Sequence, residues 1–317
     1  MARNWLRRVV LAAACTSVAL LAACSSSVTE SALSPSRFVA FGDGFGDVGQ
    51  SGSAYTVNDG TTNVWTRQLA ARYGMELKST AAGGFSYAQG NSRVANKPDA
   101  AGVTATLTLT EQIDAFLASN TVGPRDVFIL NAGTADIVAE MAAVTAGSQT
   151  VAQMTANATL AGRAMAAQTR RLVTAGAKYV VIVGPYNLGR SPWAIAIGQE
   201  TPLEEASSRF NEDLLVNVVD LGANVLYVDA ALQFNLMTAT PAAYDFFDAT
   251  TVVCNSVDAG PGIGIGAGQV NSALCSASTI TSGLAYSGYI WADKVYPTPA
   301  AHVRMGDYAY DRLSTRW

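Results

Sequence analysis

The stretch FGDGFGDVG, residues 41–49, follows directly after the apolar run FVA at residues 38–40. An apolar run that leads into glycines and aspartates is typical of a buried strand that ends in a loop. Three kinds of loop fit this composition: a phosphate-binding loop, a calcium-binding loop and an active-site loop. The segments around it help to choose between them.

Apolar strands alternate with helices along the chain. Runs typical of buried strands occupy residues 38–41, 126–130, 179–183 and 225–228. Helical spacing of apolar residues is found at 63–73, 110–119, 151–175, 202–221 and 299–313. This order predicts an α/β fold in which helices cover both faces of a mainly parallel, five-stranded sheet. Since active loops of such sheets follow the carboxyl ends of strands, residues 41–49 stand where a site is expected.

The phosphate and calcium interpretations of the loop fit poorly. Residues 44–49 satisfy the pattern GxGxxG, but Asp43 and Asp47 would repel a pyrophosphate. The two aspartates lack the twelve-residue ligand pattern of a calcium loop and its closing glutamate. We expect Asp47 to cap or brace the loop instead.

The active-site interpretation rests on several blocks that occur in order. Residues 41–49 resemble the first block, FGDSLSDxG, of the GDSL or SGNH lipases and esterases. Further resemblances are AAGG at 81–84, LNAGTADI at 130–137, GP and LGRSP at 184–192, and DKVYPT at 293–298. The resemblance covers residues 37–317, and the segment at 184–192 is similar to bacterial phospholipase-like members. It implies one three-layer α/β/α domain with a flavodoxin-like strand order.

The chain departs from this family at the positions of the chemistry. Gly44 stands at the nucleophilic serine, Tyr296 at the catalytic histidine and Ala135 at the oxyanion asparagine, whereas Asp293 keeps the expected residue. The family's oxyanion-hole positions fall on Gly44, Gly84 and Ala135. Glycine cannot form an acyl-enzyme, and a phenol that titrates at about 10 is a poor base at neutral pH. We therefore expect an inactive domain that binds an acyl, ester or carboxylate ligand.

Two other functions stay open. The chain could be an active ester hydrolase in which Asp293 or His302 activates water, or a structural or envelope-interaction lipoprotein with a closed pocket. An open pocket above Gly44 favours ligand binding, and a pocket filled by Tyr296 favours the structural role. We expect His302 to be a packed helix residue. Ser86 and Thr134 are expected to be turn residues.

The N-terminus is a targeting segment. Arg3, Arg7 and Arg8 precede the apolar residues 9–23, and LAAC at 21–24 resembles the lipobox of bacterial lipoproteins. This divides the chain into a signal peptide at 1–23, a Ser-rich tether at 24–36 and the domain at 37–317. We expect Cys24 to carry lipid and to hold the protein at a membrane of the cell envelope, on the periplasmic or surface side.

The remaining composition bounds the partners and cofactors. In an exported protein Cys254 and Cys275 are expected to form a disulfide. Closing the loop between them should stabilise the folded state by roughly 3 kcal/mol. With one histidine in the chain we predict no metal site, and we expect no cofactor. A net charge of −4 gives no reason to expect nucleic acid binding. We expect a monomer.

Overall fold

The computed structural model describes residues 32–61 and 64–317. The predicted signal peptide and Cys24 lie outside the described residues. Residues Leu33–Trp317 form one compact unit. Within the described residues, no helix is both long and apolar enough to span a bilayer.

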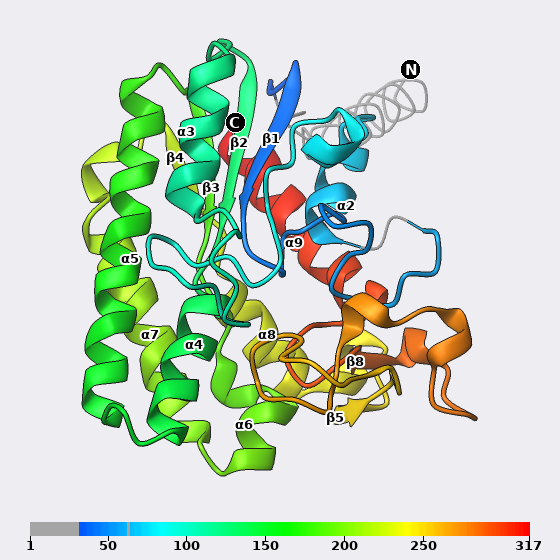
Figure 1. The fold of residues 1–317 in the computed structure, drawn as a ribbon. Helices are drawn as coiled ribbons and strands as arrows, with labels where there is room; N and C mark the ends of the chain where they lie inside the picture. Colours follow the sequence, from blue (N-terminus) through cyan, green and yellow to red (C-terminus); the bar gives the residue numbers. More distant parts are fainter. Residues whose placement is uncertain (1–31, 62–63) are drawn as a thin grey trace, which may run out of the picture. The chain divides into compact units, whose positions relative to one another are not determined.

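A parallel sheet of four strands forms the centre of this unit (Figure 1). Its order is β1 (Arg37–Gly42), β2 (Asp126–Asn131), β3 (Tyr179–Val183) and β4 (Val225–Tyr227). Almost every residue of β1, β2 and β3 is buried. This burial explains the continuous apolar runs, because helices cover both faces. The prediction of an α/β fold with a mainly parallel sheet is confirmed.

The fifth predicted strand is replaced by an extended segment, residues 85–89, beside the free edge of β1. The N–H of Ala40 donates to the carbonyl of Phe85 at 3.0 Å, and that of Tyr87 donates to Ala40 at 2.7 Å. The bridge between Ala40 and Ser86 is parallel. The sheet therefore has four strands rather than five. The segment still occupies the outer position expected of the second strand in a flavodoxin-like order.

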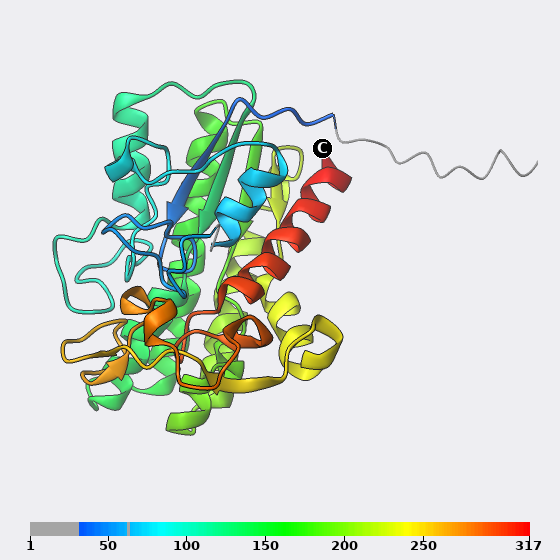
Figure 2. The same ribbon diagram turned by 90° about the vertical axis from the view of Figure 1, so that its right-hand side faces the viewer.

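Helices lie on both sides of the sheet, with α3, α5 and α7 on one side and α2 and α9 on the other (Figures 1 and 2). Their starts follow sequence signals: Thr108 and Thr150 form capping boxes, and Thr298 caps a helix with Pro299 in its first turn. The helices are α2 (Trp65–Arg72), α3 (Leu109–Ser119), α4 (Thr134–Thr145), α5 (Val151–Thr174), α6 (Pro192–Ile197), α7 (Glu200–Val216), α8 (Ala230–Ala239) and α9 (Pro299–Arg316).

The chain between α8 and α9 builds an irregular layer at the carboxyl ends of the strands. It contains β5 (Asp248–Val252) paired with β8 (Tyr289–Trp291), and β6 (Val257–Asp258) paired with β7 (Gln269–Val270). A disulfide joins Cys254 to Cys275 with Cα atoms 5.9 Å apart, as predicted. This bridge fixes a Gly-rich segment that has little regular structure of its own.

Candidate functional site

The loop after β1 is anchored from within by Asp43. Its carboxylate is fully buried and accepts hydrogen bonds from the N–H of Phe45 at 3.0 Å and of Ala135 at 3.3 Å. Ala135 lies in the first turn of α4, so the carboxylate sits at a helix N-terminus. Burial raises the pKa of Asp43 to about 7, although the backbone donors oppose this rise. Asp43 ties the loop to α4 and faces no open space.

Asp47 braces the same loop, as expected. One carboxylate oxygen accepts from the N–H groups of Gly49 (2.8 Å) and Gln50 (2.7 Å), and the other accepts from Gly90 at 2.8 Å. Burial raises the pKa of Asp47 to about 6, and these donors hold it down. The carboxylates of both aspartates in FGDGFGDVG thus accept hydrogen bonds from backbone N–H groups. The described residues contain no group of three or more acidic, histidine or cysteine side chains that could hold a metal ion.

Tyr296 lies directly on Gly44. A Cβ atom at Gly44 would stand 2.7 Å from the Tyr296 hydroxyl and 2.8 Å from the ring carbon that bears it. Tyr296 is 1% exposed, and its ring packs against Tyr55 with centroids 5.0 Å apart. Burial, with Asp43 nearby, raises the pKa of the Tyr296 phenol well above its usual value. The ring therefore fills the space above Gly44 as a neutral group.

Asp293 is buried and bonded to the backbone. One oxygen accepts from the N–H groups of Val295 (2.7 Å) and Tyr296 (2.6 Å), and the other accepts from Ser272 at 2.9 Å. Burial raises its pKa. Because Ser272 belongs to the segment closed by the disulfide, Asp293 links that segment to the turn that carries Tyr296. The carboxylate of Asp293 thus accepts from three backbone N–H groups, not from an imidazole.

The structure places Gly84 away from this cluster. Parallel pairing of Ala40 with Ser86 sets Gly84 level with Phe38, near the start of β1. Its N–H already donates to the carbonyl of Ser79 at 2.8 Å. The prediction that Gly84 joins Gly44 was therefore wrong. The error arose because residues 85–89 form the extended segment, so the glycine at its carboxyl end is Gly90.

Ala135 meets the loop through its backbone, because its N–H donates to Asp43. Its side chain is buried and offers no donor. Thr134, in the same turn, has a buried hydroxyl without a hydrogen-bond partner, and so does Ser86 in the extended segment. The expectation that these two hydroxyls bond to the backbone as turn residues was wrong.

Asn131, behind the loop, was not expected from the sequence to belong to the site. Asn131, at the end of β2, accepts from the indole N–H of Trp65 at 3.0 Å and donates to the carbonyl of Val183 at 3.2 Å. Its backbone oxygen would lie 1.8 Å from a Cβ atom at Gly42, where φ is +142°. Its position as a polar residue at the end of a buried strand could have indicated that Asn131 lies at the site.

His302 is packed inside the domain, as expected. It is fully buried, its Nδ1 accepts from the N–H of Trp65 at 3.2 Å, and its ring lies 5.4 Å from that of Phe45. Burial lowers its pKa to about 3, so the imidazole is neutral. Its Nε2 is buried without a hydrogen-bond partner.

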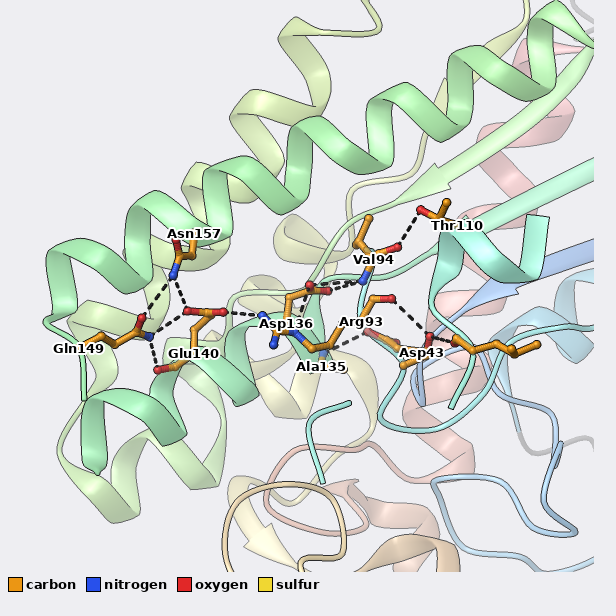
Figure 3. A network of polar contacts seen from close by, with 11 residues as sticks. Asp43, Arg93, Val94, Thr110, Ala135, Asp136, Glu140, Gln149 and Asn157 are labelled. Carbon is orange, nitrogen blue, oxygen red and sulfur yellow. Dashed lines mark hydrogen bonds and ion pairs between the residues drawn. The ribbon is translucent and has the colours of Figure 1, made fainter. Parts of the chain in front are cut away.

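A buried ionic network adjoins the loop at the start of α4 (Figure 3). Arg93 lies 3.6 Å from Asp136 and forms an ion pair with Glu140. Asp136 also accepts from the N–H of Val94 at 3.0 Å, and burial raises its pKa to about 6. Asn157 donates to Glu140 at 2.6 Å. The network connects the chain after Gly90 to α4 through one arginine that faces two carboxylates.

The cavities of the described part of the chain lie elsewhere. Four cavities of ≈270 to ≈580 Å³ are all lined by residues other than Gly44, Ala135, Asp293 and Tyr296. The structure thus brings together Gly44, Tyr296, Asp43 and Ala135, and it ties Asp293 to the same turn. None of these four cavities is lined by a residue of this cluster.

Comparisons with known proteins give weak likenesses. No family model matches the chain. A Pseudomonas putida protein, described as an uncharacterized protein in the trpE-trpG intergenic region, is 27% identical over 164 residues, which is 51% of this chain. The chain spans only about a quarter of that protein (26%).

Among solved structures, the chain resembles Est24, a carbohydrate acetylesterase from Sinorhizobium meliloti (14% identity, TM-score 0.46). It also resembles a putative arylesterase from Agrobacterium tumefaciens (15%, 0.44) and the aryl esterase of M. smegmatis (14%, 0.44). Each alignment covers 89% of this chain and 99% of the other. The structural neighbours of this chain are thus esterases, at low identity.

Proposed function

We propose that this protein is an exported lipoprotein whose domain is a catalytically silent relative of the GDSL or SGNH esterases. The observation that carries the proposal is the contact between Tyr296 and Gly44, because the ring occupies the place where an attacking side chain and its substrate would meet. In this proposal the domain acts as a structural or interaction module of the cell envelope, and lipid on Cys24 holds it at the membrane.

The chemistry of the cluster supports this function. Acyl transfer needs an oxygen nucleophile, a base and free oxyanion donors. Gly44 has no side chain, Tyr296 is a buried neutral phenol, and the N–H of Ala135 is already bonded to Asp43. Loss of the nucleophile or the base alone costs about a millionfold in comparable triads.

A rearranged hydrolase finds less support. His302 is neutral and buried against Phe45, and Asp293 is surrounded by backbone donors. Neither group lines any of the four cavities described above. A ligand above Gly44 finds equally little support, because Tyr296 would have to leave first. Of the three functions, the structural or interaction role therefore fits the contacts best.

The test is hydrolysis of short- and long-chain nitrophenyl esters by the purified full chain. We expect no turnover above that of the Asp293→Asn variant, which serves as the matched control. Turnover near that of ordinary esterases, about 10 s⁻¹, would overturn the proposal. Activity that disappears in Asp293→Asn or His302→Gln would instead favour the rearranged hydrolase. The mass of the N-terminal peptide tests the lipid on Cys24 separately.

A further inference from the structure

One edge of the domain combines the entry of the chain with exposed apolar and cationic side chains. We call it the tether edge, formed by the segments before the strands and the end of α9: residues 33–36, 120–125, 175–178, 216–224 and 312–317. The N–H of Ser36 donates to Arg125 at 2.9 Å, and that of Val180 donates to Asn224 at 2.9 Å. Figure 2 shows the end of α9 and the segment leading into β1 at this same end of the sheet.

The tether limits which edge can meet a bilayer. Leu33 is buried in the domain, and the chain from Cys24 to Leu33 reaches at most about 30 Å, at roughly 3.3–3.6 Å per residue. A domain of this length has a radius of gyration of about 19 Å and is therefore roughly 45–50 Å across. If the edge with Tyr296 touched the bilayer, Leu33 would stand farther from the surface than the tether reaches.

The tether edge carries apolar side chains that no neighbour covers. Val216, at the end of α7, is 70% exposed, and Val219, in the following turn, is 79% exposed. Large aliphatic side chains with this exposure gain from contact with an apolar phase. They lie close to Gly222, which accepts a hydrogen bond from Arg316 of α9.

The tether edge also carries cationic side chains for which no acidic partner is found among the described residues. Arg125, Lys178 and Arg312 are exposed, and the structure shows no ion pair for them within the described residues. Arg170 and Arg171, at the end of α5, are neutralised by Asp220 and Asp114. Asp311, next to this edge, contributes to raising the pKa of Arg72, which is already paired with Asp307, so Asp311 offsets one of the cations. The free charge at this edge is therefore positive, although the whole chain carries −4.

We propose that the tether edge binds the headgroup region of an anionic phospholipid bilayer, with Val216 and Val219 inserted among the headgroups and Lys178, Arg125, Arg312 and Arg316 beside the phosphates. This inference rests on the lipid anchor at Cys24 in the proposed function. Exposed apolar side chains flanked by cations suit an anionic membrane surface. The edge with Tyr296 and the disulfide then faces the aqueous side, away from the lipids of the anchoring membrane.

Depth-dependent quenching tests the orientation. Full-length lipidated protein is placed in vesicles of phosphatidylcholine and phosphatidylglycerol that contain nitroxide-labelled lipid. A bimane label on Val219→Cys should be quenched several-fold more than one on Ile195→Cys, an exposed position on α6. The double variant Lys178→Gln/Arg312→Gln, or high salt, should lower the quenching at position 219. Each removed charge should weaken the binding of this edge to the anionic surface by about fivefold. Leu232→Ser, another exposed apolar site, should not.

Two results would overturn the proposal. Equal quenching at the two labelled positions, or stronger quenching at 195, shows that the tether edge does not face the bilayer. If the mass of the peptide that contains Cys24 shows no acyl chains, the protein has no lipid anchor there, and the proposed orientation fails with it. Ester turnover by the same preparation is a separate readout, so failure of the orientation is distinguishable from failure of the silent-enzyme proposal.

Discussion

At the scale of single residues, the contact between Gly44 and Tyr296 decides the chemistry of the site. Glycine is required at position 44 by space, since its φ lies outside the left-handed region and the nearest obstacle is the tyrosine hydroxyl. Tyr296 in turn needs that space, because it is 1% exposed. The two residues therefore behave as one packing unit.

A double-mutant cycle tests this unit. Gly44→Ala should destabilise the fold by about 1–3 kcal/mol through overpacking. Tyr296→Ala should cost about 3–5 kcal/mol through lost burial. The double variant should cost less than the sum by roughly 1–3 kcal/mol, because the added methyl then occupies vacated space. Urea denaturation gives the three values.

The control for this cycle is Gly222→Ala, where a Cβ atom would meet only the carbonyl of Val219 at 3.7 Å. That variant should be nearly neutral and additive with Tyr296→Ala. If Gly44→Ala is equally neutral, the ring does not rest on Gly44 in solution.

Restoration of activity is a second prediction at this scale. Gly44→Ser supplies a nucleophile and Tyr296→His supplies a base and frees space, so each single variant should stay inactive and the pair should hydrolyse nitrophenyl esters. Adding Ala135→Asn should raise the rate by about a hundredfold, the effect of one oxyanion donor. Turnover by all four variants is compared with that of the original chain. A folded triple variant without turnover would contradict an inherited esterase geometry.

At the scale of elements, the sequence predicted what local chemistry specifies. The apolar runs at 126–130 and 179–183 match β2 and β3 within a residue, and Thr298 with Pro299 located the start of α9. The short helices α4, α6 and α8 were not predicted. Apolar residues are spread around α8, and the first turns of α4 are buried on all sides. Neither helix therefore shows the alternation of apolar and polar faces from which a helix is predicted.

The site was only partly predictable for a similar reason. The resemblance of the first and last sequence blocks to the GDSL family predicted that Gly44 and Tyr296 lie together, and the structure places them in contact. The register of the extended segment 85–89 depends on its pairing with β1, and that pairing is a long-range contact. Gly84 was therefore misplaced. The backbone bonds that occupy Asp43 and Asp293 could not be read from residue types.

The segment closed by the disulfide gives the prediction at this scale. Cys254 and Cys275 are 21 residues apart, so removing the bridge should destabilise the fold by about 3 kcal/mol. Since Ser272 in this segment donates to Asp293, the change should also loosen the turn with Tyr296. Hydrogen exchange of the Val295 and Tyr296 amides, compared between Cys254→Ala/Cys275→Ala and the original chain, measures this. Unchanged exchange would show that the turn is independent of the bridge.

At the scale of the whole molecule, buried charge links stability to pH. The pKa of Asp43 is raised to about 7 in the folded chain and is near 3.8 unfolded. Between these values the folded state binds more protons, so its stability is present at lower pH and is lost as pH rises through 7. His302, whose pKa is lowered to about 3, acts in the opposite direction, but only below its unfolded value of 6.5.

We therefore expect the free energy of unfolding to fall by about 1.4 kcal/mol between pH 6 and pH 8 because of Asp43. Urea denaturation at both pH values measures this fall. Asp43→Asn should remove this contribution. His302→Gln should make the fall steeper by about 0.8 kcal/mol, because the unfolded histidine still binds protons just above pH 6 and the folded one does not. An increase in stability over this range would mean that Asp43 is ionised in the folded protein at neutral pH.

The ring of Tyr296 above Gly44 also restricts the mutational paths open to this chain. A serine at position 44 would strain the packing while the ring is in place, so a gain of catalysis is easier if it begins at position 296. A first step at 296 leaves a cavity in the core and no new activity, so selection for hydrolysis has nothing to act on. The contact between Tyr296 and Gly44 therefore stabilises the fold and at the same time hinders the mutations that would build a working triad.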